Sequence, residues 1–159
     1  VGCMYYTFTG KTRTDGTDSP VLILNGAGVD AAHPIITVTF PHVTNEAYAP
    51  VGYGLCCASI PGTIMKEYRG KEEELDQVVR AQLSDWFPDD VQDIQNNWTL
   101  KKSYCIEHAQ PGQLRGPLPA NFHGGRNCKI LRKCSLPSGL FVCGDYMATS
   151  TLNGAIESG

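Results

Sequence analysis

The chain has 159 residues, a formal net charge of −3 at pH 7 and 42% hydrophobic residues. This charge provides no basic surface for nucleic acid, and no apolar run reaches the roughly 20 residues of a membrane-spanning helix. The length is sufficient for one domain with a hydrophobic core, so we expect a globular protein or a part of one.

Four short β-strands are predicted in the first sixty residues, at 4–8, 21–24, 35–40 and 55–60. Each segment is rich in aromatic, β-branched or other apolar residues, which favour strands. The second ends at Asn25-Gly26 and the fourth at Pro61-Gly62, and both pairs are typical turn residues. We interpret residues 41–50 as a connection.

The clearest helix is predicted over residues 72–87, because apolar side chains recur there at spacings of three and four. Three glutamates in its first turn suit the helix dipole, and Pro88 ends it. We expect four residues of its apolar face to be buried: Leu75, Val79, Leu83 and Trp86. A further strand is predicted at 98–106, interrupted by Lys101-Lys102, and a loop rich in Pro and Gly begins at His108.

The seven cysteines are odd in number, and several lie in apolar, strand-like segments. They are Cys3, Cys56, Cys57, Cys105, Cys128, Cys134 and Cys143. This pattern favours free thiols in an intracellular, reducing compartment over a disulfide framework. We predict no metal site, since the only pair with a nearby His is spaced more widely than zinc ligands usually are. Cys56-Cys57 lacks the spacer of a redox pair and is assigned to the core.

The C-terminal segment is the most informative part of the sequence. Residues 140–143 form an apolar run suited to a buried parallel strand, Gly144-Asp145 follows, and a helix is predicted to open at Leu152 after a polar loop. A carboxylate after a strand can accept hydrogen bonds from sugar-like hydroxyls, and a helix start offers unpaired backbone N–H groups. This arrangement is typical of a cofactor site.

Residues 139–159 resemble the C-terminal flavin segment of the FAD-dependent oxidoreductase superfamily. That superfamily includes flavin amine oxidases, protoporphyrinogen oxidases and phytoene-desaturase-like enzymes. Its segment is an apolar strand, Gly-Asp or Gly-Glu, a small-residue loop and Gly-Ala-x-x-Ser-Gly, which matches Gly154-Ala-Ile-Glu-Ser-Gly159 here. Weaker matches to the phytoene-desaturase-like branch occur in the same order at 21–26, 48–52, 82–86 and 106–111.

The resemblance implies an α+β fold with two parts. Residues 1–138 would belong to a substrate domain with a mixed or antiparallel sheet and a packed helix. Residues 139–159 would be the terminal strand, Asp and helix of a Rossmann-like FAD-binding domain. The family's Gly-x-Gly-x-x-Gly turn has no match, because Asn25-Gly26-Ala27-Gly28 lacks the third glycine, and we interpret it as a loop. We therefore expect a fragment or separate subunit whose dinucleotide-binding half comes from another polypeptide or a missing N-terminal segment.

By the same resemblance, the function is that of an FAD-dependent oxidoreductase, amine oxidase-like or desaturase-like, acting on an apolar or amine-bearing small molecule by hydride transfer to flavin. The residues implied to bind the cofactor are Gly144, Asp145, Leu152, Asn153 and Gly154. Candidates for the substrate pocket are Tyr48, Trp98, Tyr104 and Tyr146. No catalytic residue is identified.

Each site residue also has a structural interpretation. Asp145 could cap the following loop, and Gly154 could serve helix packing, with Ser150 or Thr151 as the N-cap. Tyr48, Trp98 and Tyr104 could be ordinary core residues. The alternative function is a non-catalytic, flavoprotein-derived structural subunit of a larger assembly. Family analogy is compatible with a plastid; the cytoplasm is the other expected location.

Overall fold

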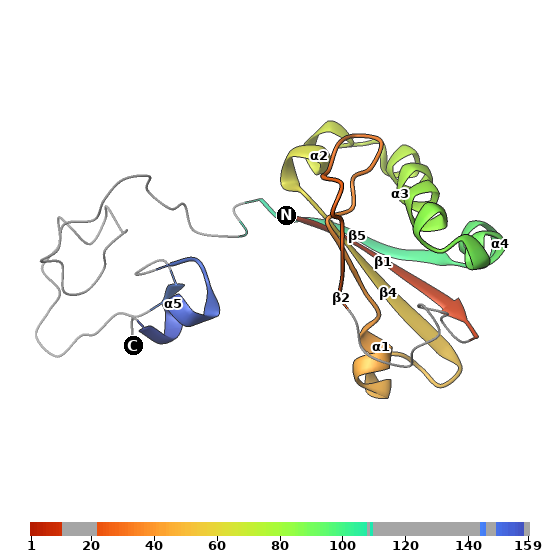
Figure 1. Ribbon diagram of the computed structural model, residues 1–159, viewed down its shortest axis with the longest axis horizontal. Coiled ribbons are helices and arrows are strands. Elements are labelled where there is room, and N and C mark those ends of the chain that lie inside the picture. The colour runs from red at the N-terminus through yellow and green to blue at the C-terminus, as the bar shows by residue number, and fades with distance from the viewer. Residues whose placement is uncertain (11–21, 108, 110–143, 146–148, 158–159) are drawn as a thin grey trace, which may run out of the picture. The chain divides into compact units, whose positions relative to one another are not determined.

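The computed structural model describes residues 1–10, 22–107, 109, 144–145 and 149–157. The chain divides into two compact units, Val1–Glu107 and His108–Gly159 (Figure 1). The first unit has the predicted α+β character. In the second, the described helix is α5, Leu152–Glu157, at the position that the sequence predicts. The predicted strand at 140–143 and the domain boundary at 138 lie outside the described residues.

The first unit contains one five-stranded sheet with the order β2-β3-β4-β1-β5. Its strands are β1 Gly2–Thr9, β2 Leu22–Leu24, β3 Thr37–Thr39, β4 Tyr53–Ile60 and β5 Thr99–Cys105. All four neighbouring pairs are antiparallel, so of the two predicted sheet types the antiparallel one is observed. The register of β5 against β1 shifts beside Lys101, and this bulge lies where the two lysines interrupt the apolar pattern.

Helix α3, Glu72–Trp86, confirms the predicted helix. The shorter elements were not predicted, because segments of three to six residues show no helical period. These are α1 Pro41–Thr44, η1 Glu46–Tyr48, α2 Gly62–Glu67, η2 Pro88–Asp90 and α4 Val91–Asn96. None of the helices in the described parts of the chain is long and apolar enough to cross a membrane.

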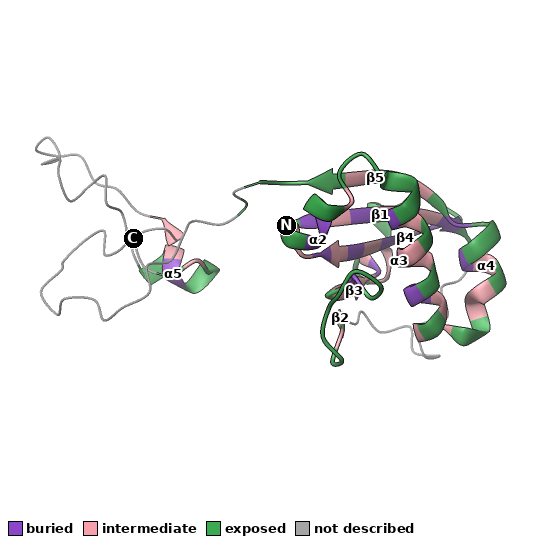
Figure 2. Ribbon diagram, turned by 90° about the horizontal axis from the view of Figure 1, so that it is seen from above, coloured by how far each residue is buried: buried purple, intermediate pink, exposed green. Residues whose placement is uncertain are grey.

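The core lies between one face of the sheet and the helices. Buried and half-buried residues alternate along β1 and β4, as the period of two requires (Figure 2). Helix α3 contributes Leu75, Val79 and Leu83, each at most 1% exposed. Trp86 was predicted to be buried, but it is only partly buried. It occupies the last position of the helix and packs against the edge of the core.

One buried polar residue was not predicted. Gln82 is 2% exposed on α3, and its Oε1 accepts a hydrogen bond of 2.9 Å from the backbone N–H of Ile35. This bond joins the helix to the segment that leads into β3. A buried amide is tolerated there because the partner is itself a buried backbone donor.

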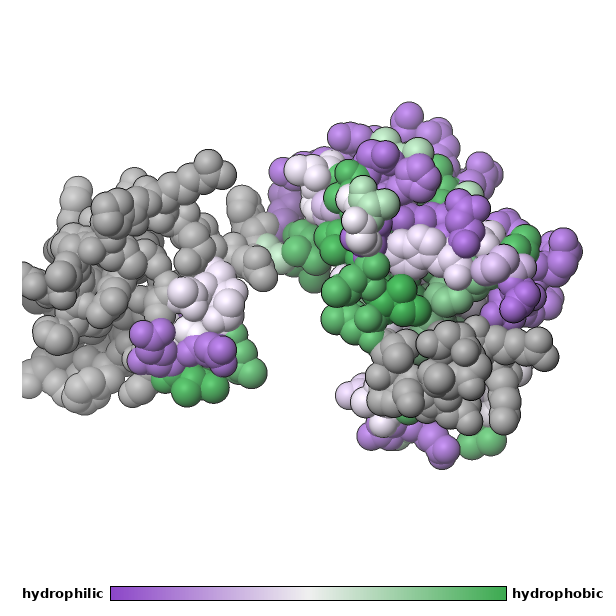
Figure 3. All heavy atoms as spheres, in the orientation of Figure 1, coloured by the Kyte–Doolittle hydropathy of each residue, from purple (hydrophilic) through white to green (hydrophobic). Residues whose placement is uncertain are grey.

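The other face of the sheet, which we call the open face, has two adjacent cross-strand rows. One row is Leu22, Thr39, Cys57, Tyr5 and Lys102; the next is Leu24, Thr37, Ser59, Cys3 and Tyr104. Leu22 and Leu24 are 59% and 64% exposed. Figure 3 shows apolar residues gathered on the surface of this unit. Helices α2, α3 and α4 supply their buried residues to the core and not to this face.

Candidate functional site

The start of helix α5 is capped by Thr151. Its Oγ1 accepts a hydrogen bond of 3.0 Å from the backbone N–H of Gly154, and its carbonyl accepts one of 3.0 Å from Ala155. The Thr149 hydroxyl lies 2.9 Å from the Thr151 hydroxyl. Of the two residues expected as N-cap, Thr151 has this role, and the bonds fix the direction in which the helix begins.

Two positions of this segment, Gly154 and Gly144, require glycine for steric or conformational reasons. A Cβ on buried Gly154 would lie 2.0 Å from the Thr149 carbonyl oxygen. Thr149 can therefore pack this closely against the helix only because glycine has no Cβ. Gly144 has a φ of 153°, which other residues rarely adopt. Asp145 directly follows it and is half-buried. Tyr146 lies outside the described residues.

The first unit has a cavity of about 500 Å³ on the open face. It is lined by Cys3, Tyr5, Leu55, Lys102, Tyr104 and Ile106. Tyr104 is 45% exposed, stands edge-on to Tyr5 at 5.9 Å and has the Lys102 ammonium 5.7 Å from its ring centroid. Of the aromatic residues suggested for substrate contact, Tyr104 therefore borders a cavity.

The other two candidates lie elsewhere. Tyr48 ends η1 and is 63% exposed. Trp98 is 6% exposed, stacks on Phe8 with ring centroids 4.6 Å apart and donates from Nε1 to Asp93 at 3.0 Å. Trp98 is therefore a core residue, because both its ring and its N–H have partners within the fold.

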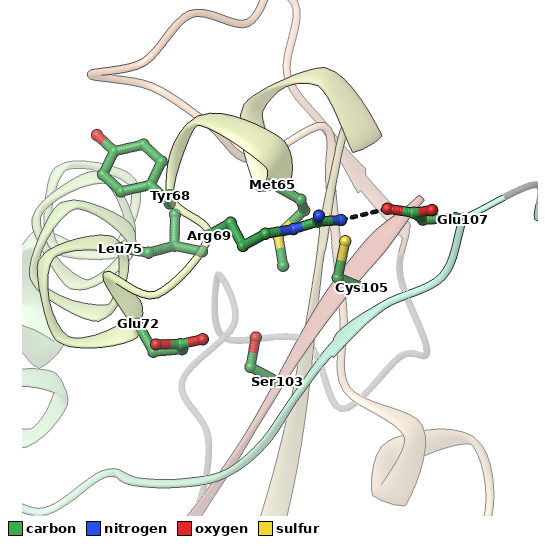
Figure 4. A pocket seen from close by; sticks show the side chains of 8 residues that line it. All are labelled: Met65, Tyr68, Arg69, Glu72, Leu75, Ser103, Cys105 and Glu107. Carbon is green, nitrogen blue, oxygen red and sulfur yellow. Dashed lines mark hydrogen bonds and ion pairs between the residues drawn. The ribbon is translucent and has the colours of Figure 1, made fainter.

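A second cavity of about 400 Å³ lies beside the end of β5 and is lined from α2, α3 and β5 (Figure 4). There Arg69 points across the opening and pairs with Glu107, while Glu72 and Ser103 lie on the other side (Figure 4). The two paired side chains are 68% and 49% exposed. Such an exposed ion pair is weak, so we assign this cavity no chemical role.

A pair of thiols on the open face was missed by the sequence analysis. Cys3 Sγ and Cys57 Sγ are 2.9 Å apart, whereas Cys56 faces the core. The contact with Cys3 lowers the pKa of Cys57 to about 6, against the effect of burial. Sequence spacing could not have found the pair, because it depends on the pairing of β1 with β4. The four cysteines of the described segments are free thiols, and the residues described there include no cluster of three metal ligands.

Comparison with known families decides the assignment. The family model for flavin containing amine oxidoreductases matches residues 17–159, which include β2 to β5 and the capped helix α5. The chain belongs to this family. No curated protein and no solved structure matches it. The resemblance inferred from the C-terminal segment is thereby confirmed at the level of the family.

Flavin-containing amine oxidoreductases require a flavin, and the described donors and acceptors fit one. The Thr151 cap uses the N–H groups of Gly154 and Ala155, which leaves those of Leu152 and Asn153 without a partner among the described residues. A helix start with unpaired N–H groups attracts negative charge, and Asp145 adds an acceptor for hydroxyl groups. These are the two chemical features that the ring and the ribityl chain of a flavin call for.

For this flavin-containing amine oxidoreductase, we expect Gly154→Ala to open the α5 cap, because the new methyl group cannot fit against Thr149. The cost should be about 1–3 kcal/mol of local stability. Hydrogen exchange at the Ala155 N–H, which is bonded to Thr151, should accelerate by about one to two orders of magnitude. Asn153→Ala, at an exposed position of the same helix, is the control. Equal exchange rates at the Ala155 N–H in both variants would show that the new methyl group is accommodated without loss of local stability.

Proposed function

We propose that this chain is part of an FAD-dependent oxidoreductase that oxidises an apolar or amine-bearing small molecule. The observation that supports it best is the Thr151-capped start of α5, in a segment that lies inside the family match. When bound, the flavin would supply the redox chemistry, as hydride acceptor, that protein side chains lack. The chain's own residues would bind and polarise the flavin and orient the substrate.

In this proposal, the C-terminal segment holds the flavin. The Asp145 carboxylate accepts a hydrogen bond from a ribityl hydroxyl, and Gly144 allows the backbone turn before it. The N–H groups of Leu152 and Asn153 would supply donors for the negative charge that a flavin ring gains on reduction. Gly154 keeps the helix start close to Thr149 and so fixes the direction of these donors.

The same proposal assigns residues 1–138 to the substrate domain and 139–159 to the FAD-binding domain. The open-face cavity is its candidate for contact with an apolar part of the substrate, because Leu55, Tyr104 and Ile106 line it. Lys102 disfavours a cationic amine at this spot, since its own charge lies over the Tyr104 ring. The pyrophosphate would be bound by a glycine-rich turn from another polypeptide or segment.

The test uses the complete enzyme, with its dinucleotide-binding half present. Asp145→Ala should raise the Kd for FAD about ten- to a hundredfold, because a charge-assisted hydrogen bond contributes about 1.5–3 kcal/mol. The Kd of Asp145→Asn should lie between those of the wild type and Asp145→Ala. The control is Asp89→Ala, which removes an exposed carboxylate of η2. Equilibrium dialysis with flavin fluorescence measures the affinity. An unchanged Kd for Asp145→Ala would remove this residue from the cofactor site.

Bleaching of the flavin absorbance on addition of substrate then separates an enzyme from a structural subunit. We expect anaerobic bleaching by an apolar or amine-bearing reductant, followed by recovery when an electron acceptor is added. Bound flavin that no such compound reduces would favour the non-catalytic subunit.

A further inference from the structure

The open face brings two cysteines together from distant parts of the chain. Cys3 lies on β1 opposite Ser59, and Cys57 lies on β4 opposite Tyr5, so the two are diagonal neighbours on one face. Both are half-buried, and their sulfur atoms are 2.9 Å apart. A disulfide bond is about 2.05 Å long, so the two sulfur atoms must come closer by a little under about 1 Å for the bond to form.

The surroundings make the two thiols unequal. The contact with Cys3, with smaller contributions from Tyr5 and Thr39, lowers the pKa of Cys57 to about 6 against the effect of burial. The same contact raises the pKa of Cys3. The groups that face the pair from the neighbouring strands are Tyr5 on β1 and Lys102 and Tyr104 on β5. One proton shared between two sulfur atoms 2.9 Å apart favours a thiolate on one of them, and the lowered pKa of Cys57 makes it the candidate nucleophile of the pair.

The pair is also accessible. Cys3 and Tyr5 line the open-face cavity, and the Lys102 ammonium at its border attracts anions. Cys56, the next residue in the chain, is fully buried in the core and has a raised pKa. A reagent that enters the cavity meets Cys3 directly, and the sulfur of half-buried Cys57 lies 2.9 Å from that of Cys3, whereas Cys56 is out of reach.

We propose that Cys3 and Cys57 form a dithiol site that undergoes exchange with anionic low-molecular-weight disulfides of the glutathione type. The Cys57 thiolate attacks one sulfur of the disulfide, its S–S bond breaks, and one thiolate leaves. Cys3 then loses its proton and attacks Cys57 Sγ, which releases the second thiolate and closes the Cys3–Cys57 disulfide. In total, the protein dithiol is oxidised by two electrons, and one disulfide is reduced to two thiols.

This site is independent of the proposed flavin chemistry. Its residues lie on β1 and β4 of the first unit, and thiol exchange requires no flavin. The expected resting state has both cysteines reduced. Closure of the bridge would link the N-terminal strand covalently to β4.

The experiment treats the reduced full chain with oxidised glutathione and maps the products by mass spectrometry without reduction. We expect a Cys3–Cys57 disulfide, with Cys57 modified first and the bridge reversed by excess reduced glutathione. Because the order of modification is read from the wild-type protein, this result needs no variant. Glutathione that remains on Cys57, a link from Cys57 to Cys128, Cys134 or Cys143, or no modification of Cys57 would overturn the proposal.

Two variants separate the roles. In Cys3→Ser, the mixed disulfide should persist on Cys57, since the resolving thiol is absent. Cys105→Ser, at an exposed position of β5, is the matched control and should form the Cys3–Cys57 bridge as the wild type does. A Cys3→Ser protein that loses its glutathione as fast as the control would show that Cys3 does not resolve the adduct.

The pH dependence gives a second readout. At pH 6, a thiol with a pKa of about 6 is half ionised, whereas an ordinary cysteine with a pKa near 8.5 is ionised to about 0.3%. Weaker nucleophilicity of the low-pKa thiolate offsets about tenfold of this advantage, so alkylation of Cys57 should be about tenfold faster than that of a cysteine peptide. The rate should rise with pH to a plateau, with its midpoint near 6; a midpoint above 8 would contradict the assignment of Cys57 as the nucleophile.

Discussion

Arg80→Ala is expected to lower the free energy of unfolding of the first unit by about 3–5 kcal/mol. The Arg80 side chain is 11% exposed, and its guanidinium donates to Asp76 Oδ2 and to the Trp98 carbonyl, both at 2.9 Å, and also to the Ile94 carbonyl. Asp76 in turn accepts from Tyr6 Oη at 2.7 Å. The variant would leave a half-buried carboxylate and two carbonyls without this donor, which costs more than the pair itself contributes.

The control is Arg69→Ala, because Arg69 forms an ion pair with Glu107 but is 68% exposed. Its loss should cost less than about 1 kcal/mol. Urea unfolding followed by tryptophan fluorescence measures both variants, since both tryptophans, Trp86 and Trp98, belong to the first unit. Arg80→Lys should keep part of the stability, as an ammonium cannot reach all three acceptors at once. Equal midpoints for the two alanine variants would show that the buried network adds nothing.

The second large effect concerns FAD. A polypeptide of residues 1–159 expressed alone should contain no bound FAD after gel filtration, whereas the assembly with a dinucleotide-binding half should contain about one per chain. In the proposed function, these residues provide donors for the ring and an acceptor for the ribityl chain, but their sequence has no Gly-x-Gly-x-x-Gly turn for the pyrophosphate. That doubly charged group requires its own helix N-terminus and contributes much of the affinity.

Absorbance at the flavin band against protein concentration gives the stoichiometry. Apoprotein should also fail to take up added FAD at micromolar concentration. The assembled protein is the positive control, and addition of the dinucleotide-binding half to the isolated chain should restore uptake. Stoichiometric FAD in the isolated chain would mean that the pyrophosphate is bound by residues that we have not identified.

The regular elements of the first unit could be predicted because their sequence periods are strong. The spacing of Leu75, Val79 and Leu83 defines α3, and the turn residues after Leu24 and Ile60 limit β2 and β4. The observed ends of these elements differ from the predicted ones by at most two residues, because hydrogen bonding between strands, and not composition, determines where a strand ends. The edge strand β2 is short, as its partner β3 offers only three paired residues.

Some candidate site residues could likewise be predicted from the sequence, and others could not. The Thr151 cap and the α5 start could be predicted, because they lie within a few residues of each other in the sequence. The pairing of Cys3 with Cys57 and the buried role of Gln82 could not, because each depends on a partner 47 to 54 residues away. Trp98 illustrates the opposite case: a large aromatic residue is a reasonable candidate for a pocket until the position of its ring is known.

The place of β1 in the sheet also has a consequence for biosynthesis. This strand contains residues 2–9, yet it lies between β4 and β5, and its second partner ends at Cys105. During synthesis, its hydrogen-bonding groups on the β5 side must wait for nearly one hundred further residues, while α3 can form locally. The sheet should therefore close late and slowly, and a nascent chain that stalls before β5 exposes an apolar strand edge that chaperones recognise.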